Sequence, residues 1–200
     1  MDSDVRKLFD KAKALIDSKR FGLILTRLFE EIEQSEEKEE EFFFGHTFSR
    51  SSYSRFEKAV KKKNLDDKED FHKYLYSLIK ERGISQAKLA MLSEINETNI
   101  NKYIKGTRRP NDVETVFRIA LSLQLSEKET ELLLRKNSMG FKESEMDAVI
   151  IEAISQKVFD IHKIESVIRN LTKGKRSLYS EKERRELGDR DEDWDIDIVD

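Results

Sequence analysis

Glycine and proline are scarce in this chain, which holds 7 Gly and 1 Pro among its 200 residues. Each chain reversal in a β-sandwich or a hairpin meander usually takes a Gly, Pro or Asn-Gly turn. The sequence therefore holds too few turn residues to connect many strands. Hydrophobic residues make up 37% of the chain and charged residues 40%. This balance is typical of amphipathic helices with solvated outer faces, and it predicts an all-α fold.

Several classes of function are disfavoured because their residues or motifs are missing. The chain has no Cys, which excludes disulfides, thiolate zinc sites and cysteine nucleophiles. His46, His72 and His162 lie without a second His or a carboxylate at metal-ligand spacing. No Gly-rich phosphate loop, nucleophile elbow or paired-carboxylate motif occurs. We therefore expect no enzymatic activity, with no catalytic residues, no metal and no cofactor.

Membrane and secretory signals are also missing from the sequence. No apolar run approaches the roughly 18–20 residues that a membrane helix needs. The first residues lack the basic stretch and the apolar block of a secretory signal. We therefore expect a cytoplasmic protein with no membrane partner.

Hydrophobic periodicity and charge divide the chain into five parts. Residues 1–34 hold two amphipathic helices, which predict an N-terminal helical hairpin joined near residues 18–22. An acidic and Ser-rich linker is predicted at residues 35–67, because a run of like charges rarely packs. A domain follows at residues 68–138, and its capping residues and glycines predict five short helices at 71–82, 85–93, 96–105, 112–124 and 126–136.

The last two parts follow this domain. Residues 139–172 predict two accessory helices, near 142–157 and 161–171, which are candidates for dimerisation. After Thr172 the periodicity ends and charged residues dominate, so the acidic tail at residues 173–200 is predicted to be disordered.

The charge of the chain is unevenly placed. The net charge is −3 overall, but residues 71–110 hold eight basic and three acidic residues. A basic window of domain size is the electrostatic footprint expected of a nucleic-acid contact surface. Basic patches also serve acidic protein partners, so the charge alone leaves both kinds of partner open.

The most informative stretch is residues 84–110, which predict two short helices with a tight break between them. Leu89 faces inward on the first helix, and Ile95 lies in the break as a buried plug. Ile100, together with either Tyr103 or Ile104, buries the inner face of the second helix. The outward face is polar, rich in amide side chains and partly basic: Glu97, Thr98, Asn99, Asn101, Lys102 and Lys105. Such a face can enter the major groove of DNA, where Asn pairs with adenine and Lys with guanine.

This pattern resembles the helix-turn-helix of the Cro/repressor-type (XRE-family) regulators, over about residues 70–136. The matching elements stand at the family's intervals: Ile84-Ser85-Gln86, Leu89-Ala90, Ile95-Asn96, Ile100 and Gly106-Thr107-Arg108-Arg109-Pro110. The resemblance implies a five-helix domain and a sequence-specific transcriptional regulator, a repressor, that binds double-stranded DNA. Palindromic half-sites one turn apart normally require a two-fold dimer, so a homodimer is expected.

The resemblance also assigns roles to individual residues. Gln86 is implied to hold a phosphate together with the backbone amides at the start of its helix, where an anion is favoured. Asn96 is implied to cap the recognition helix near a second phosphate. The complete implied DNA-binding set comprises phosphate contacts, base-reading positions and residues at their margin: Ser85, Gln86, Asn96, Glu97, Thr98, Asn99, Asn101, Lys102, Lys105, Arg108 and Arg109.

Two residues depart from the family pattern. The residue before the buried Ile95 is usually Gly because the turn needs a positive φ, so Glu94 predicts a slightly different turn. Glu97 places a negative charge at the groove edge, where it repels phosphate unless it accepts from a cytosine amino group. A second interpretation therefore stays open: an adaptor or antitoxin-like partner that keeps the fold without strong DNA binding. Its protein contacts would lie on the N-terminal helices or the acidic tail.

Overall fold

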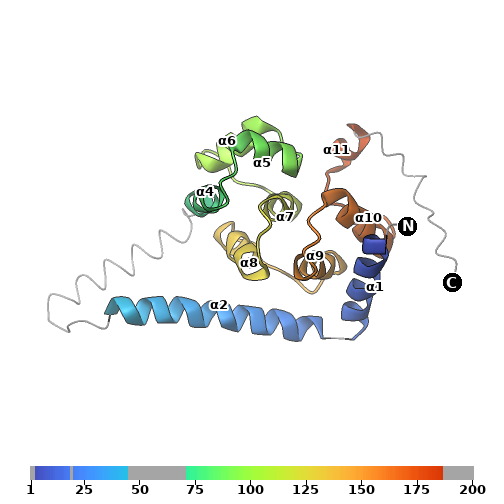
Figure 1. The fold of residues 1–200 in the computed structure, drawn as a ribbon, viewed down its shortest axis with the longest axis horizontal. Coiled ribbons are helices and arrows are strands. Elements are labelled where there is room, and N and C mark those ends of the chain that lie inside the picture. Colours follow the sequence, from blue (N-terminus) through green and yellow to red (C-terminus); the bar gives the residue numbers. More distant parts are fainter. Residues whose placement is uncertain (1–2, 19, 45–70, 187–200) are drawn as a thin grey trace.

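The computed structural model describes residues 3–18, 20–44 and 71–186. Within these ranges all regular structure is helical, which confirms the predicted all-α class. Figure 1 shows the two N-terminal helices along two sides of the remaining ones. The helices are α1 (Ser3–Asp17), α2 (Phe21–Phe44), α4 (Phe71–Glu81), α5 (Gln86–Ser93), α6 (Glu97–Ile104), α7 (Val113–Ser122), α8 (Glu127–Lys136), α9 (Glu145–Ser155), α10 (Ile161–Leu171) and α11 (Glu181–Glu186).

Capping side chains fix where the short helices α5 to α8 begin. The Ser85 hydroxyl accepts from the backbone N–H of Lys88 at 3.2 Å, and the Asn96 Oδ1 accepts from that of Thr98 at 2.9 Å. Ser126 and Glu129 form the reciprocal capping box that the sequence predicts. Each such cap stabilises its helix by about 1 kcal/mol. The five helices predicted for residues 71–136 are confirmed, with ends that differ by one or two residues.

Helix α7 is the centre of the molecule. Every residue from Thr115 to Ser122 is buried, because α7 packs against α5 and α8 while the C-terminal part of the chain covers its remaining side. The ring of Phe117 stacks on Phe141, from the loop after α8, with 5.6 Å between ring centroids. One continuous hydrophobic core therefore extends from the five predicted helices into the helices that follow.

The two N-terminal helices are present, but they do not form the predicted hairpin. Helix α1 packs against α9 and α10, whereas α2 lies along α8, so their main partners are different (Figure 1). The buried residues of α1, Val5, Leu8, Ala12 and Leu15, are those that the sequence placed on one face. The apolar face of α1 is buried against α9 and α10, so it is not available to pair with α2 in a hairpin.

The prediction of a linker at residues 35–67 is wrong for its first ten residues. Residues 35–44 continue helix α2 to Phe44 instead of leaving it at residue 34. Glu and Lys are good helix formers, so a charged run is compatible with a helix even where no tertiary contact requires one. The remainder of the predicted linker, residues 45–67, lies outside the described residues.

Helices α9 and α10 use their apolar faces inside the chain. Residues Met146 to Ile151 of α9 are buried, and α9 contacts α1, α8 and α10. The sequence offered these two amphipathic helices as dimerisation elements because they directly follow the fifth predicted helix of the domain. Within the described residues α1 covers these faces, so a proposal of dimerisation no longer follows from them.

The prediction of disorder after Thr172 is wrong for residues 173–186. Leu178 is 0% exposed and Tyr179 is 6% exposed, and helix α11 follows directly. Burial of these two side chains compensates for the entropy of ordering a mostly polar segment. The rest of the predicted tail, residues 187–200, lies outside the described residues. None of the described helices is long and apolar enough to cross a membrane.

Candidate nucleic-acid interface

Helices α5 and α6 meet at a tight turn held by buried side chains. Leu89 on α5 and Ile100 on α6 are fully buried, and Ile95 plugs the turn between them. Tyr103 is buried on the inner face of α6, and burial raises the pKa of its hydroxyl. These residues fix the opposite face of α6 toward solvent, as the sequence predicts.

The turn itself is the left-handed one, despite the side chain at position 94. Glu94 has φ 53° and ψ 32°, and its backbone N–H bonds back to the carbonyls of Ala90 and Met91. The expectation of a different turn is therefore wrong. An L-residue in this conformation costs about 1–2 kcal/mol relative to Gly. Contacts of Glu94 with other parts of the chain offset that cost, as described below.

Helix α6 is followed closely by a glycine, Gly106, whose conformation and surroundings suit a residue without a Cβ. Gly106 has φ +69°, and a Cβ at this position would lie 3.0 Å from the ring of His72 on α4. Both the conformation and the close approach therefore disfavour any residue with a Cβ. The contact holds the end of α6 against α4, which fixes the second end of the exposed helix.

The structure brings most of the residues implied in DNA binding onto one surface. The side chains of Glu97, Thr98 and Lys102 are exposed along α6, and that of Lys105 is exposed at its C-cap. Gln86 lies half-exposed at the first position of α5. Ser85 and Asn96 cap α5 and α6, and Arg108 is exposed in the loop after α6. We call the exposed side chains of Thr98, Lys102 and Lys105 the outer face of α6.

Three of the implied residues lie differently from the rest. Asn99 is half-buried on the flank of α6, beside a cleft described below. Asn101 is half-buried, and its Oδ1 has no hydrogen-bond partner among the described residues. The guanidinium of Arg109 faces the end of α8, where Nη1 lies 3.5 Å from the carbonyl of Lys136. The structure therefore separates Arg109 from the outer face of α6.

Residues 75–129 match the protein-family model Helix-turn-helix, which describes the Cro/C1-type domain of the XRE family. These residues form a helix-turn-helix domain. The match confirms the resemblance that the sequence shows, and it spans helices α4 to α7 and the start of α8. No curated protein and no solved structure matches the chain.

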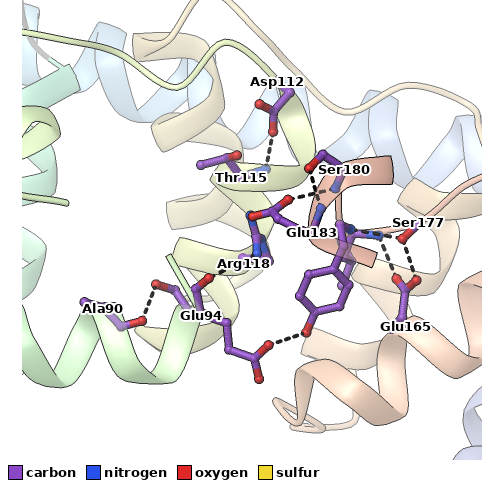
Figure 2. A network of polar contacts seen from close by, with 12 residues as sticks. Ala90, Glu94, Asp112, Thr115, Arg118, Glu165, Ser177, Ser180 and Glu183 are labelled. Carbon is purple, nitrogen blue, oxygen red and sulfur yellow. Dashed lines mark hydrogen bonds and ion pairs between the residues drawn. The ribbon is translucent and has the colours of Figure 1, made fainter. Parts of the chain in front are cut away.

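The helix-turn-helix turn is tied to residues far away in sequence, which the sequence did not predict. Figure 2 shows Arg118 of α7 between Glu94 and Glu183 of α11. The hydroxyl of Tyr179 donates to Glu94 Oε2 at 3.0 Å, and His162 Nε2 lies 2.7 Å from Glu94 Oε1. Burial first, and then the Glu94 carboxylate, raise the pKa of Tyr179, so its hydroxyl remains a proton donor at neutral pH.

Arg118 is the second link between the helix-turn-helix domain and the C-terminal segment. It is 3% exposed, and its guanidinium lies 5.0 Å from the centre of the Tyr179 ring. Nη1 donates to the Glu94 carbonyl at 3.4 Å, and Nη2 donates to Glu183 Oε1 at 2.8 Å. Burial raises the pKa of Glu183, but hydrogen bonds from Arg118 and Ser180 outweigh it and lower that pKa below its ordinary value. The pair is therefore ionised at neutral pH.

A cleft of about 630 Å³ lies between the flank of α6 and the C-terminal segment. Asn96, Asn99 and Arg108 line it from the helix-turn-helix domain, and Lys182 and Glu186 line it from α11. The described residues hold no group of His, Asp and Glu that could bind a metal ion. The cleft is polar on both walls, and it borders the outer face of α6 without including it.

Proposed function

We propose that this protein is a sequence-specific, DNA-binding transcriptional regulator that acts as a repressor. The observation that supports it most directly is the outer face of α6, which a helix-turn-helix domain presents with Thr98, Lys102 and Lys105 exposed. A helix of this size fits the major groove, where such side chains contact base edges. Amplification of bound sequences from a random duplex pool tests the proposal, because a specific regulator enriches one motif.

In this proposal each residue has a role that follows from its place. Glu97, Thr98 and Lys102 contact base edges, while Asn99 and Asn101 stand at the margin of the readout. Gln86 and the first amides of α5 bind a phosphate, as helix N-termini do, and Ser85 and Asn96 lie beside the two helix starts. Lys105 and Arg108 contact phosphates further along, and Arg109 joins them only after its guanidinium leaves the Lys136 carbonyl.

A homodimer is part of the proposal. Half-sites one helical turn apart require two copies related by a two-fold axis, and one domain of this size contacts too few bases for tight binding. The enriched motif supplies the test. A palindrome with half-sites about 10 base pairs apart supports the dimer, whereas a single asymmetric half-site contradicts it.

One observation favours a second candidate function. Glu97 is exposed at the first position of α6, where its charge repels phosphate. An adaptor or antitoxin-like protein that uses the domain as a scaffold has no need to avoid this charge. The selection experiment separates the two candidates, because an adaptor enriches no sequence from the pool.

Lys102→Ala is expected to relax the preference at one base pair and to cost about 1–3 kcal/mol on the best site. The reason is that Lys102 lies one turn beyond Thr98 on the outer face of α6, within reach of a base edge. Competition binding against all substitutions of the enriched motif measures the change. Lys142→Ala, an equal truncation at an exposed position before α9, is the control. Equal losses on every sequence would instead identify Lys102 as a phosphate contact.

Gln86→Ala is expected to weaken specific and random duplexes by a similar factor while the preferred sequence stays the same. A residue at the start of α5 binds the backbone, which is alike in all sequences. Titration of both duplexes measures the two affinities, and Gln34→Ala, on an exposed part of α2, is the control. A changed sequence preference would show that Gln86 contacts a base.

A further inference from the structure

The C-terminal segment that holds Glu94 is itself fixed on two sides. The buried carboxylate of Glu165 on α10 accepts from the hydroxyl of Ser177 and from the backbone N–H of Leu178, both at 2.6 Å. On the other side Glu183 pairs with Arg118 of α7. Figure 2 shows these contacts at the two ends of one short stretch. Residues 177–183 therefore form a rigid bridge, which we call the C-terminal clamp, and not a loose tail.

The clamp contacts Glu94, a residue of the helix-turn-helix domain whose backbone lies in the left-handed region although it carries a side chain. Glu94 sets the angle between α5 and α6, and its left-handed conformation is unfavourable for a residue with a side chain. The Tyr179 hydroxyl and the His162 ring hold its carboxylate, and Arg118 holds its carbonyl. The contacts therefore stabilise the turn from both its side chain and its backbone.

The clamp lies on the flank of α6 and leaves the outer face open. The cleft between them is lined by Asn96, Asn99 and Tyr103 on the α6 side. Thr98, Lys102 and Lys105 do not line this cleft, and their side chains are exposed. A segment in this place supports the helix without covering the side chains proposed to contact bases.

We infer that the C-terminal clamp positions α6 for base readout, with Tyr179 and Arg118 acting through Glu94 as positioning residues. This inference rests on the proposed DNA-binding function. A turn that is held in one conformation presents all base-contacting side chains in register, whereas a loosened turn populates the competent arrangement only part of the time. Affinity for a specific site then falls in proportion to the competent fraction. Contacts with phosphate tolerate small shifts, because Lys and Arg side chains are long and flexible.

Tyr179→Phe in the full chain tests the inference with the smallest change. The variant removes the hydroxyl that bonds Glu94 and keeps the buried ring over Arg118. Affinity for the enriched motif is expected to fall about fivefold, while affinity for random duplex stays within about twofold of the original. Tyr76→Phe, at an exposed tyrosine of α4, is the matched control and is expected to change neither affinity.

Each other result overturns the inference. Tighter binding to the motif would mean that the clamp opposes DNA binding. Equal losses on the motif and on random duplex would mean that the clamp contacts phosphate or merely stabilises the fold. Unchanged affinities would mean that the Tyr179 hydroxyl has no influence on α6.

A measurement without DNA keeps this test separate from the proposed function. The amide of Ile95 donates to the Ala90 carbonyl across the turn, and the amide of Thr98 donates to Asn96 Oδ1 at the start of α6. Hydrogen exchange at these amides is expected to be about fivefold faster in Tyr179→Phe, while exchange at Leu133 in α8 stays the same. If the original protein enriches no DNA sequence, the proposed function fails, and faster exchange still supports the clamp. If the exchange rates of all three amides are the same in Tyr179→Phe as in the original protein, the inference is overturned.

Discussion

Phe117→Ala is expected to lower the free energy of unfolding by about 3–5 kcal/mol. Phe117 is 0% exposed at the centre of α7, and its ring stacks on Phe141. Truncation removes the buried ring and leaves a cavity that rigid helices on several sides fill only in part. For a protein of this size the loss corresponds to a fall of about 10 °C in the unfolding temperature, which circular dichroism measures.

The same experiment asks whether the helix-turn-helix domain and the C-terminal helices unfold together. Because α7 belongs to one core with both parts, a single transition is expected, and the variant shifts all of it. Leu23→Ala on α2, where the side chain is 70% exposed, is the control and is expected to change stability by less than about 0.5 kcal/mol. A second transition that keeps its original midpoint in Phe117→Ala would show two independent units.

The five-helix domain could be predicted because its signals are local. Ser85, Asn96 and Ser126 each precede a helix and accept a backbone hydrogen bond within three residues, so their effect depends little on distant parts of the chain. Helical spacing alone puts Ile100 inside α6 and Thr98 and Lys102 outside. It left Tyr103 and Ile104 as alternatives for the second buried residue, and in the structure Tyr103 is the buried one. Local signals of this kind survive whatever packs around them.

The C-terminal clamp escaped prediction because two buried residues make no periodic pattern. Leu178 and Tyr179 stand between charged and polar residues, and hydrophobic periodicity needs several turns of helix before it is visible. One signal was available. Ser180 and Glu183 have the spacing of a capping box, and in the structure each accepts from the backbone N–H of the other. A capping box in a supposedly disordered tail indicates a helix start.

Glu94 shows how tertiary contacts override a local preference. The sequence correctly marks the position as one where Gly is usual, and the energetic penalty of a side chain there is real. The conclusion that the turn must differ was wrong, because it left out Tyr179, which lies 85 residues away in sequence and bonds to the Glu94 carboxylate. The orientation of Arg109 toward Lys136 was hidden for the same reason. Such contacts exist only after the chain has folded.

Binding to random duplex DNA is expected to weaken about a thousandfold when salt rises from 50 to 200 mM, if about six phosphates are contacted. The cations available on this side of the protein include Lys102 and Lys105 on α6 and Arg108 beyond it, all exposed. Each phosphate that a cation neutralises releases condensed counterions, and this release becomes less favourable as salt increases. Fluorescence anisotropy with a labelled random duplex, repeated at several salt concentrations, gives the slope.

Single substitutions then show which cations produce that slope. Lys105→Ala and Arg108→Ala are each expected to reduce its magnitude by about one for every protomer bound, because each protomer loses one phosphate contact. Lys142→Ala, which is exposed away from the proposed interface, is expected to leave the slope unchanged. If Lys105→Ala and Arg108→Ala leave the slope as unchanged as the control does, the DNA contact lies on another surface. If the original protein shows no binding at 50 mM salt, DNA is not its partner, and the charge of Glu97 on α6 then fits the adaptor function better than the regulator.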